Sequence, residues 1–89
     1  MACAAGVRRV DVAVVGAGIS GLACASLLQA RHTVMVLEAR QRVGGRLLSI
    51  DGVDVGASGS WPVARRVASY SRRLGVGPIP QHRDGLAFN

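Results

Sequence analysis

The chain has 89 residues, 49% hydrophobic and 18% charged, which is typical of one small globular unit and excludes disordered and fibrous classes. Eleven basic residues, all arginine, outweigh five acidic ones and give a formal charge of +6. The arginines come in scattered pairs and no aromatic stacking platform accompanies them, which argues against nucleic-acid binding. No apolar stretch is long enough for a signal peptide or a membrane span, so the default location is cytoplasmic.

The first predicted elements form a strand–helix–strand unit over residues 10–38. Val10–Val15 is β-branched and apolar on both faces, as in a strand of a covered parallel sheet. Ile19–Arg31 combines small and apolar residues and indicates a helix, in which we expect Cys24 to be buried. Thr33–Glu38 is a second β-branched run. This order predicts an α/β fold with a partial Rossmann-like βαβ dinucleotide-binding unit.

The next predicted elements, over residues 39–57, are a polar loop and a β-hairpin. Asp51 and Gly52 separate two short β runs, Leu47–Ile50 and Val53–Val55. Asp-Gly at this place favours a two-residue hairpin turn, because both residues tolerate positive φ.

A second helix is predicted over residues 62–74, with Pro62 in its first turn and Gly75 at its C-terminal cap. Four apolar residues recur along it at helical spacing: Val63, Val67, Tyr70 and Leu74. Residues 76–89 form a tail without a recognisable element. We therefore expect residues 1–89 to be an incomplete domain.

A glycine-rich turn joins the first predicted strand to the first predicted helix. Its residues fit the pattern GxGxxG and are Gly16, Ala17, Gly18, Ile19, Ser20 and Gly21. Gly16 permits the sharp turn, Gly18 lets the backbone approach a pyrophosphate, and Gly21 lets the helix pack closely on the strand. The first amides of the helix and its dipole would face the anion, so this context predicts a dinucleotide-binding turn.

Glu38 ends the second predicted strand, 17 residues after the last glycine of the turn. A carboxylate at this place accepts hydrogen bonds from the ribose hydroxyls of the adenosine half of a dinucleotide. It would repel a 2′-phosphate, which disfavours NADP. The alternative is a glycine-rich turn with an unrelated surface glutamate, but context, spacing and acid together favour nucleotide binding.

The loop after this acid carries a second pair of glycines, Gly44 and Gly45, together with Ala39, Arg40 and Arg46. Paired glycines allow a second close backbone approach, and the Arg46 guanidinium offers a fork of donors to phosphate or ribose oxygens. The alternative is a flexible loop with solvated arginines, because paired glycines are also common in turns.

The glycine turn, the acid and the Gly-Gly-Arg triplet together resemble the FAD-binding N-terminus of flavin-containing amine oxidases, a family that includes monoamine and polyamine oxidases. The resemblance covers roughly residues 10–75 and marks the chain as part of an FAD/NAD(P)-binding domain. It implies FAD as the cofactor, with the glycine turn at the diphosphate and Glu38 at the adenosine ribose. Ala39 and Arg40 would lie along the cofactor.

The same resemblance assigns residues to the second half of the cofactor. It implies that Gly44, Gly45 and Arg46 contact the ribityl–diphosphate side, and that Gly56 and Ala57 line the approach to the isoalloxazine ring. The sequence departs from the family pattern just beyond, where two extra residues precede Trp61. We therefore expect Trp61 to anchor the following helix, with a place beside the flavin as the alternative.

The resemblance implies a fragment of an enzyme that oxidises an amine, with polyamines among the candidates, to an imine and produces hydrogen peroxide. Its partners would be a small-molecule amine and the remainder of the FAD and substrate domains, without nucleic acid or membrane. Another FAD oxidoreductase of the same fold, such as a carotenoid desaturase or protoporphyrinogen oxidase, and a non-catalytic nucleotide-binding module remain as alternatives.

No catalytic or metal-binding residue is expected in the chain. The family places a lysine near the flavin, and this sequence contains no lysine. His32 and His82 have no Ser, Cys or carboxylate at a catalytic spacing, and no cluster of metal ligands is present. We therefore do not expect activity from these residues alone.

Overall fold

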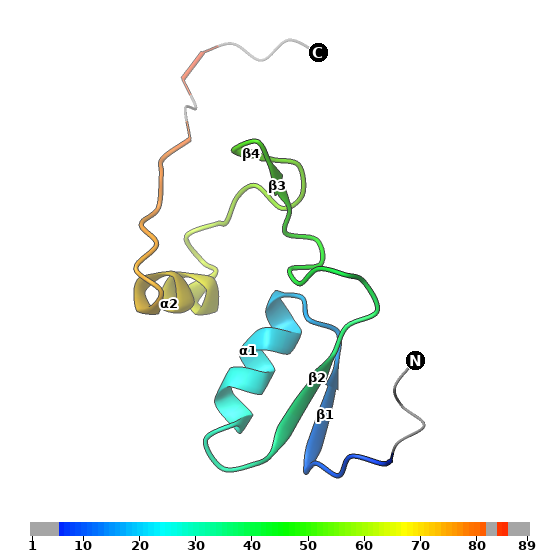
Figure 1. The fold of residues 1–89 in the computed structure, drawn as a ribbon. Coiled ribbons are helices and arrows are strands. Elements are labelled where there is room, and N and C mark those ends of the chain that lie inside the picture. Colours follow the sequence, from blue (N-terminus) through cyan, green and yellow to red (C-terminus); the bar gives the residue numbers. More distant parts are fainter. Residues whose placement is uncertain (1–5, 82–83, 86–89) are drawn as a thin grey trace. The chain divides into compact units, whose positions relative to one another are not determined.

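A computed structural model of the protein describes residues 6–81, 84 and 85, and the expected tail extends beyond these residues. The chain divides into two compact units, Met1–Ser58 and Gly59–Asn89, which are considered separately. The first unit contains, in chain order, β1 (Val12–Val15), α1 (Ile19–Leu28), β2 (Val34–Leu37), β3 (Ser49–Ile50) and β4 (Val53–Asp54), and the second contains α2 (Arg65–Arg73) (Figure 1).

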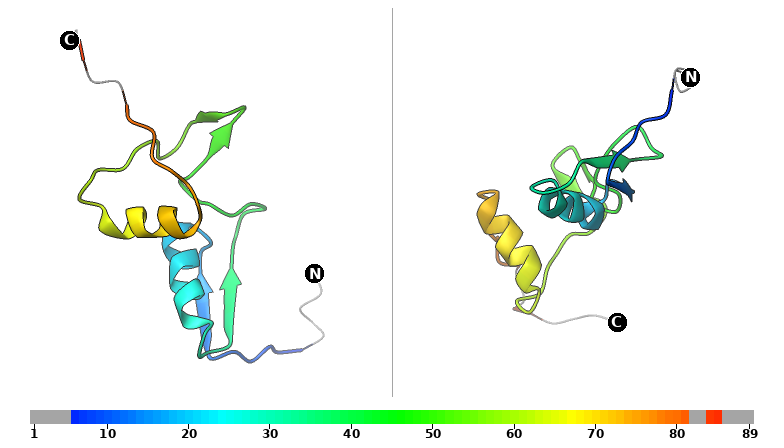
Figure 2. Two further views of the ribbon diagram at one scale, coloured as in Figure 1. Left: turned by 90° about the vertical axis from the view of Figure 1, so that its left-hand side faces the viewer. Right: turned by 90° about the horizontal axis from the view of Figure 1, so that it is seen from below.

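The centre of the first unit is a parallel pair of strands with a helix on one face. β1 pairs with β2 in a register that sets Val12 opposite Val34 and Val14 opposite Val36. These four valines are half-buried and share one face of the sheet, because side chains alternate along a strand. A Cβ built on Gly21 of α1 would lie 3.3 Å from Cγ1 of Val14, so this is the face that α1 covers, and Figure 2 shows α1 running along the two strands. A parallel pair joined by a helix is the βαβ unit, so the predicted partial Rossmann-like α/β fold is confirmed.

The other face of this sheet is apolar and open among the described residues. Val15 is 85% exposed, and its register partner Leu37 is 48% exposed. The apolar character of both strand faces predicted a sheet covered on both sides. Among the described residues of the first unit only the α1 face is covered, because this unit contains one helix.

α1 is shorter than expected, and it ends at Leu28 instead of Arg31. The Leu28 carbonyl accepts hydrogen bonds from the N–H groups of both Arg31 and His32, at 3.1 and 3.0 Å. This closes a tight turn that leads directly into β2. The expectation for Cys24 is wrong, since its thiol is exposed and free on α1.

The predicted hairpin is formed by β3 and β4, which are antiparallel. Its two turn residues, Asp51 and Gly52, have φ values of 50° and 78°. Positive φ at both positions is what a type I′ turn requires, so the Asp-Gly prediction is confirmed. The Ser49 hydroxyl also donates a hydrogen bond to the Asp54 carboxylate across the two strands.

In the second unit, α2 begins at Arg65, three residues later than Pro62. Pro62 lies instead in a turn closed by a hydrogen bond from the Ala64 N–H to the Trp61 carbonyl, at 2.9 Å. The Trp61 side chain is 67% exposed, and an anchoring role for it stays a prediction. Val63 and Leu74, at the ends of the predicted apolar stripe, are also exposed.

The C-terminus of α2 is capped as predicted. Gly75 has a φ of 72°, and its N–H donates to the Arg72 carbonyl at 3.2 Å. The N–H of Val76 donates to the Ser71 carbonyl at 2.8 Å. These two bonds form a Schellman motif, which satisfies carbonyls at the helix end and uses the conformational freedom of glycine.

Neither helix in the described part of the chain combines the length and apolar character needed to cross a lipid bilayer.

Candidate functional site

The glycine turn is built at the carboxyl end of β1. Gly16 has a φ of 105°, a conformation that favours glycine, and its N–H donates to the Leu37 carbonyl at 2.7 Å. A Cβ placed on Gly21 would overlap the Gly16 carbonyl oxygen and lie 3.3 Å from Cγ1 of Val14. Gly21 therefore allows α1 to pass close to β1, as its place in the motif predicts.

Gly18 lies at the N-terminal end of α1 and faces open space. It is the N-cap residue, with φ −78°, and a Cβ placed on it would meet no atom of the described chain within 4 Å. The first turn of α1 contains no acidic residue and no side-chain cap within the described residues, and Ile19 and Ser20 are exposed there. Backbone amides and the positive end of the helix dipole are thus available to an anion.

The Glu38 carboxylate points into the corner formed by the glycine turn. Its Oε1 accepts a hydrogen bond from the Ala17 N–H at 2.9 Å, and its Oε2 accepts one from the Arg40 N–H at 2.8 Å. These amide donors, Arg40 first and Ala17 second, lower the pKa of the Glu38 carboxyl below its ordinary value. A fixed and ionised carboxylate with remaining lone pairs can accept hydroxyl donors at this corner.

The Gly-Gly-Arg loop is held against the glycine turn through Ala17. The Gly44 N–H donates to the Ala17 carbonyl at 2.8 Å, and Gly44 forms an isolated β-bridge with Gly18. A Cβ placed on Gly45 would lie 3.4 Å from the Gly18 Cα. Ala17 is only 2% exposed. The structure thus brings together three parts that the sequence separates: the glycine turn, Glu38 and the second glycine pair.

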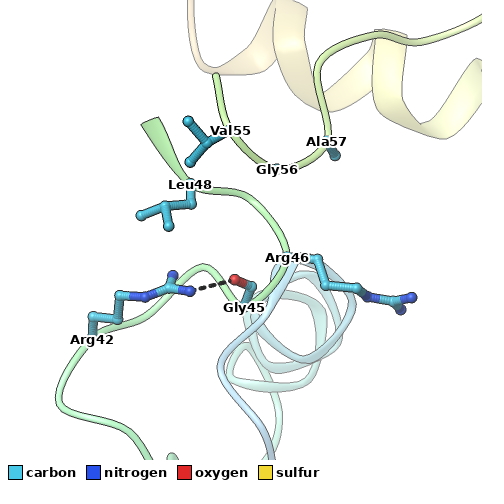
Figure 3. A pocket seen from close by; sticks show the side chains of 7 residues that line it. All are labelled: Arg42, Gly45, Arg46, Leu48, Val55, Gly56 and Ala57. Atoms are coloured by element: carbon cyan, nitrogen blue, oxygen red, sulfur yellow. Dashed lines mark hydrogen bonds between the residues drawn. The ribbon is translucent and has the colours of Figure 1, made fainter. Parts of the chain in front are cut away.

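The residues assigned to the second half of the cofactor adjoin this loop. An open cavity of about 410 Å³ has seven lining residues, namely Arg42, Gly45, Arg46, Leu48, Val55, Gly56 and Ala57 (Figure 3). The Ala57 N–H donates to the Arg46 carbonyl at 3.0 Å, and a Cβ placed on Gly56 would overlap that same carbonyl oxygen. Arg46, Gly56 and Ala57 therefore form one wall, whereas the side chains of Ala39 and Arg40 are exposed after β2.

Arg42 is a part of this site that sequence reasoning missed. Its guanidinium points toward the glycine pair and donates to the Gly45 carbonyl at 2.7 Å, while the Arg46 guanidinium points away from it (Figure 3). The loop contains three arginines at close spacing, and sequence alone gives no way to tell which one folds back onto the backbone.

Catalytic groups are not gathered at this site. His32 lies in the turn before β2, where its Nδ1 is 4.0 Å from Asp11 Oδ2, at the opposite end of the strands from the glycine turn. His82 lies outside the described residues. The described residues contain no group of His, Cys, Asp and Glu that could hold a metal ion. The arrangement can hold an anionic, sugar-containing ligand, and it offers no acid–base pair for chemistry.

Comparison with known proteins agrees with this geometry. Residues 14–74 match the family described as the NAD(P)-binding Rossmann-like domain. The chain is 47% identical over 81 residues to a Mycobacterium tuberculosis protein named as a flavin-containing monoamine oxidase, AofH, covering 85% of the chain and 18% of that relative. It is 48% identical over 73 residues to flavin-containing amine oxidase A of Bos taurus, covering 74% of the chain and 14% of that relative.

A solved structure of putrescine oxidase bound to putrescine is similar with a TM-score of 0.67 and 45% identity, covering 74% of the chain and 16% of that structure. The chain thus spans less than a fifth of the length of each of these relatives. The family match covers most of the chain, and these relatives are nearly half identical to it over the residues aligned, so the resemblance seen in the sequence is confirmed. The chain belongs to the NAD(P)-binding Rossmann-like domain family, and over most of its length it is similar to proteins named as flavin-containing amine oxidases.

Proposed function

We propose that this segment holds FAD within an amine-oxidising flavoenzyme. The observation that carries the proposal is the corner made by Gly18, Glu38 and Gly44, in which an open helix N-terminus, a fixed carboxylate and a second glycine backbone meet. These are the features that a diphosphate and an adjoining ribose require. The relatives named as flavin-containing amine oxidases support FAD as the dinucleotide.

Different residues would contact different parts of FAD. The amides at the start of α1, near Gly18, would receive the diphosphate, and the Glu38 carboxylate would accept the hydroxyl groups of the adenosine ribose. Arg40 would lie along the adenosine half. The wall formed by Arg46, Gly56 and Ala57 would line the cavity that the ribityl–flavin side enters.

The chemistry would come from the flavin itself, which supplies a hydride acceptor for the carbon next to an amine, giving an imine, and which oxygen reoxidises to give hydrogen peroxide. The part of this chain is to bind and orient. The amine substrate and any catalytic groups would contact residues other than those of the glycine corner, because no acid–base pair lies there among the described residues.

We also propose that the open face of the β1–β2 sheet packs against further elements of the same enzyme. Val15 and Leu37 leave apolar surface exposed on that face. Parallel sheets are usually covered on both faces, and the curated relatives are several times longer than this segment.

The proposal is tested by titrating the full-length protein, freed of its cofactor, with FAD, NAD and NADP. Calorimetry measures the binding of all three, and flavin fluorescence also follows the binding of FAD. We expect FAD to bind with the highest affinity, and NADP with the lowest because its 2′-phosphate would meet the Glu38 carboxylate. Tighter binding of NADP than of NAD would contradict the role of Glu38. Binding of NAD in preference to FAD would favour a nucleotide-binding module of another kind.

A further inference from the structure

The Arg42 guanidinium donates hydrogen bonds to three backbone carbonyls of its own loop. Its Nη2 donates to the Gly45 carbonyl at 2.7 Å, and its Nη1 donates to the carbonyls of Val43 and Leu47 at 3.2 and 3.4 Å. The guanidinium therefore binds the carbonyls of alternate residues in one short segment, and Figure 3 shows its bond to Gly45.

This segment is a glycine turn that needs such support. Gly44 and Gly45 have φ values of 105° and 60°, and the Leu47 N–H donates to the Gly44 carbonyl at 3.0 Å, which closes the turn. Glycine loses more conformational freedom on ordering than other residues, so two successive glycines do not hold one geometry by themselves. A planar fork of fixed donors can fix several carbonyls at once.

The planarity of the peptide bond carries the effect of Arg42 to the opposite side of the loop. In a trans peptide the C=O and the following N–H point in opposite directions, and the described chain contains no cis peptide bond. The Val43 carbonyl points to Arg42, and the Gly44 N–H of the same peptide indeed points away, to the Ala17 carbonyl at 2.8 Å. The same geometry applies to the peptide between Gly45 and Arg46, whose carbonyl also accepts a hydrogen bond from Arg42.

We infer that Arg42 is a positioning residue that aims the Arg46 backbone N–H, together with the Gly44–Gly45 backbone, at the diphosphate–ribityl part of the cofactor. The Gly45 carbonyl is held by Arg42, so the Arg46 N–H must face the other side of the loop, and no acceptor within the described residues takes it. Arg42 acts through this peptide and not by touching the ligand. The assignment of the ligand rests on the proposed function.

The test uses the natural polypeptide at its full length and compares Arg42→Gln and Arg42→Lys with Arg31→Gln. Arg31 is an exposed arginine in the turn after α1, so its replacement removes the same charge away from the loop. Amide hydrogen exchange of Gly44 and Val14 is measured in the FAD-free protein, and FAD affinity is measured separately by titration.

In both Arg42 variants we expect the Gly44 amide to exchange about tenfold faster or more, while the exchange rate of the Val14 amide in β1 stays unchanged. Both variants should also bind FAD about tenfold more weakly. Arg31→Gln should change neither quantity. Lysine keeps the charge but lacks the planar fork, so wild-type affinity in Arg42→Lys would show that charge alone suffices and would overturn the inference. Equal acceleration at Gly44 and Val14 would mean a global loss of stability and would also overturn it, as would an unprotected Gly44 amide in the unchanged protein.

These outcomes separate the two proposals. Faster Gly44 exchange in the Arg42 variants of a protein that binds no FAD would refute the proposed function and leave the positioning of the loop supported. Normal FAD binding with unchanged Gly44 exchange in both variants would refute the positioning role alone.

Discussion

The backbone N–H of Ala17 donates a hydrogen bond to Oε1 of Glu38 at 2.9 Å, across 21 residues of sequence. The carbonyl of the same Ala17 accepts the N–H of Gly44 at 2.8 Å. One buried alanine in the glycine turn thus ties the acid at the end of β2 to the second glycine pair. The candidate site depends on this arrangement, and each prediction below alters one part of it.

Replacing Glu38 should weaken FAD binding while leaving the fold largely intact. Glu38→Ala removes the acceptor of the ribose hydroxyls and of two backbone amides, and we expect the affinity for FAD to fall about tenfold or more. Glu38→Gln keeps one acceptor oxygen and should lose less. Flavin content after purification and FAD titration measure the effect. Asp51→Asn is the matched control, because it removes a carboxylate at the hairpin turn and should bind FAD normally.

Acid should remove the contribution of Glu38 to stability. Its pKa is lowered in the folded state, so its contribution is complete above the ordinary carboxyl pKa and is lost as the pH falls through the lowered folded value. The difference in the free energy of unfolding between wild type and Glu38→Gln should therefore shrink below about pH 4. Urea unfolding at a series of pH values checks this, and a difference that grows on acidification would have the wrong sign.

Adding a methyl group at Gly21 should affect mainly stability, whereas adding one at Gly18 should affect mainly FAD binding. Gly21→Ala sets a Cβ against the Gly16 carbonyl, and we expect a loss of roughly 1–3 kcal/mol in stability, although alanine ordinarily favours a helix. Gly18→Ala meets only open space and should melt like wild type, yet bind FAD weakly because its methyl occupies the approach to the backbone. Thermal melting and FAD titration of both variants give the comparison, and normal FAD binding by Gly18→Ala would count against a diphosphate there.

The hairpin turn should tolerate asparagine and reject alanine. Asp51 and Gly52 both have positive φ, a region that Asn and Gly enter at low cost and that costs other residues about 1–2 kcal/mol. Gly52→Ala should therefore raise hydrogen exchange in β3 and β4, whereas Asp51→Asn should not. Gly77→Ala is the control, because a Cβ on Gly77 would meet no atom within 4 Å and the φ of Gly77 is not positive. Similar exchange in all three variants would mean that the turn does not set the strand pairing.

The elements whose causes are local could be predicted from the amino-acid sequence. The β-branched runs predicted the two strands, GxGxxG predicted the turn into α1, and Asp51-Gly52 predicted the hairpin turn. Each of these depends on the φ preferences and side-chain shapes of adjacent residues. The Gly75 cap was predictable for the same reason. Helix boundaries were not, since α1 ends where the Leu28 carbonyl closes the turn that β2 requires.

The way in which the separate motifs meet could not be predicted from the sequence, because it depends on long-range contacts. Pattern and spacing cannot tell whether the Glu38 carboxylate turns toward Ala17, whether Gly44 bridges to Gly18, or that Arg42 folds onto its own loop while Arg46 lies on the cavity wall. These contacts depend on chain reversals over 20 or more residues and on the choice among equivalent arginine rotamers. The exposure of Cys24 likewise depends on which side of α1 faces the sheet. Burial of a helical residue is set by its packing partner and not by its apolar neighbours in the sequence.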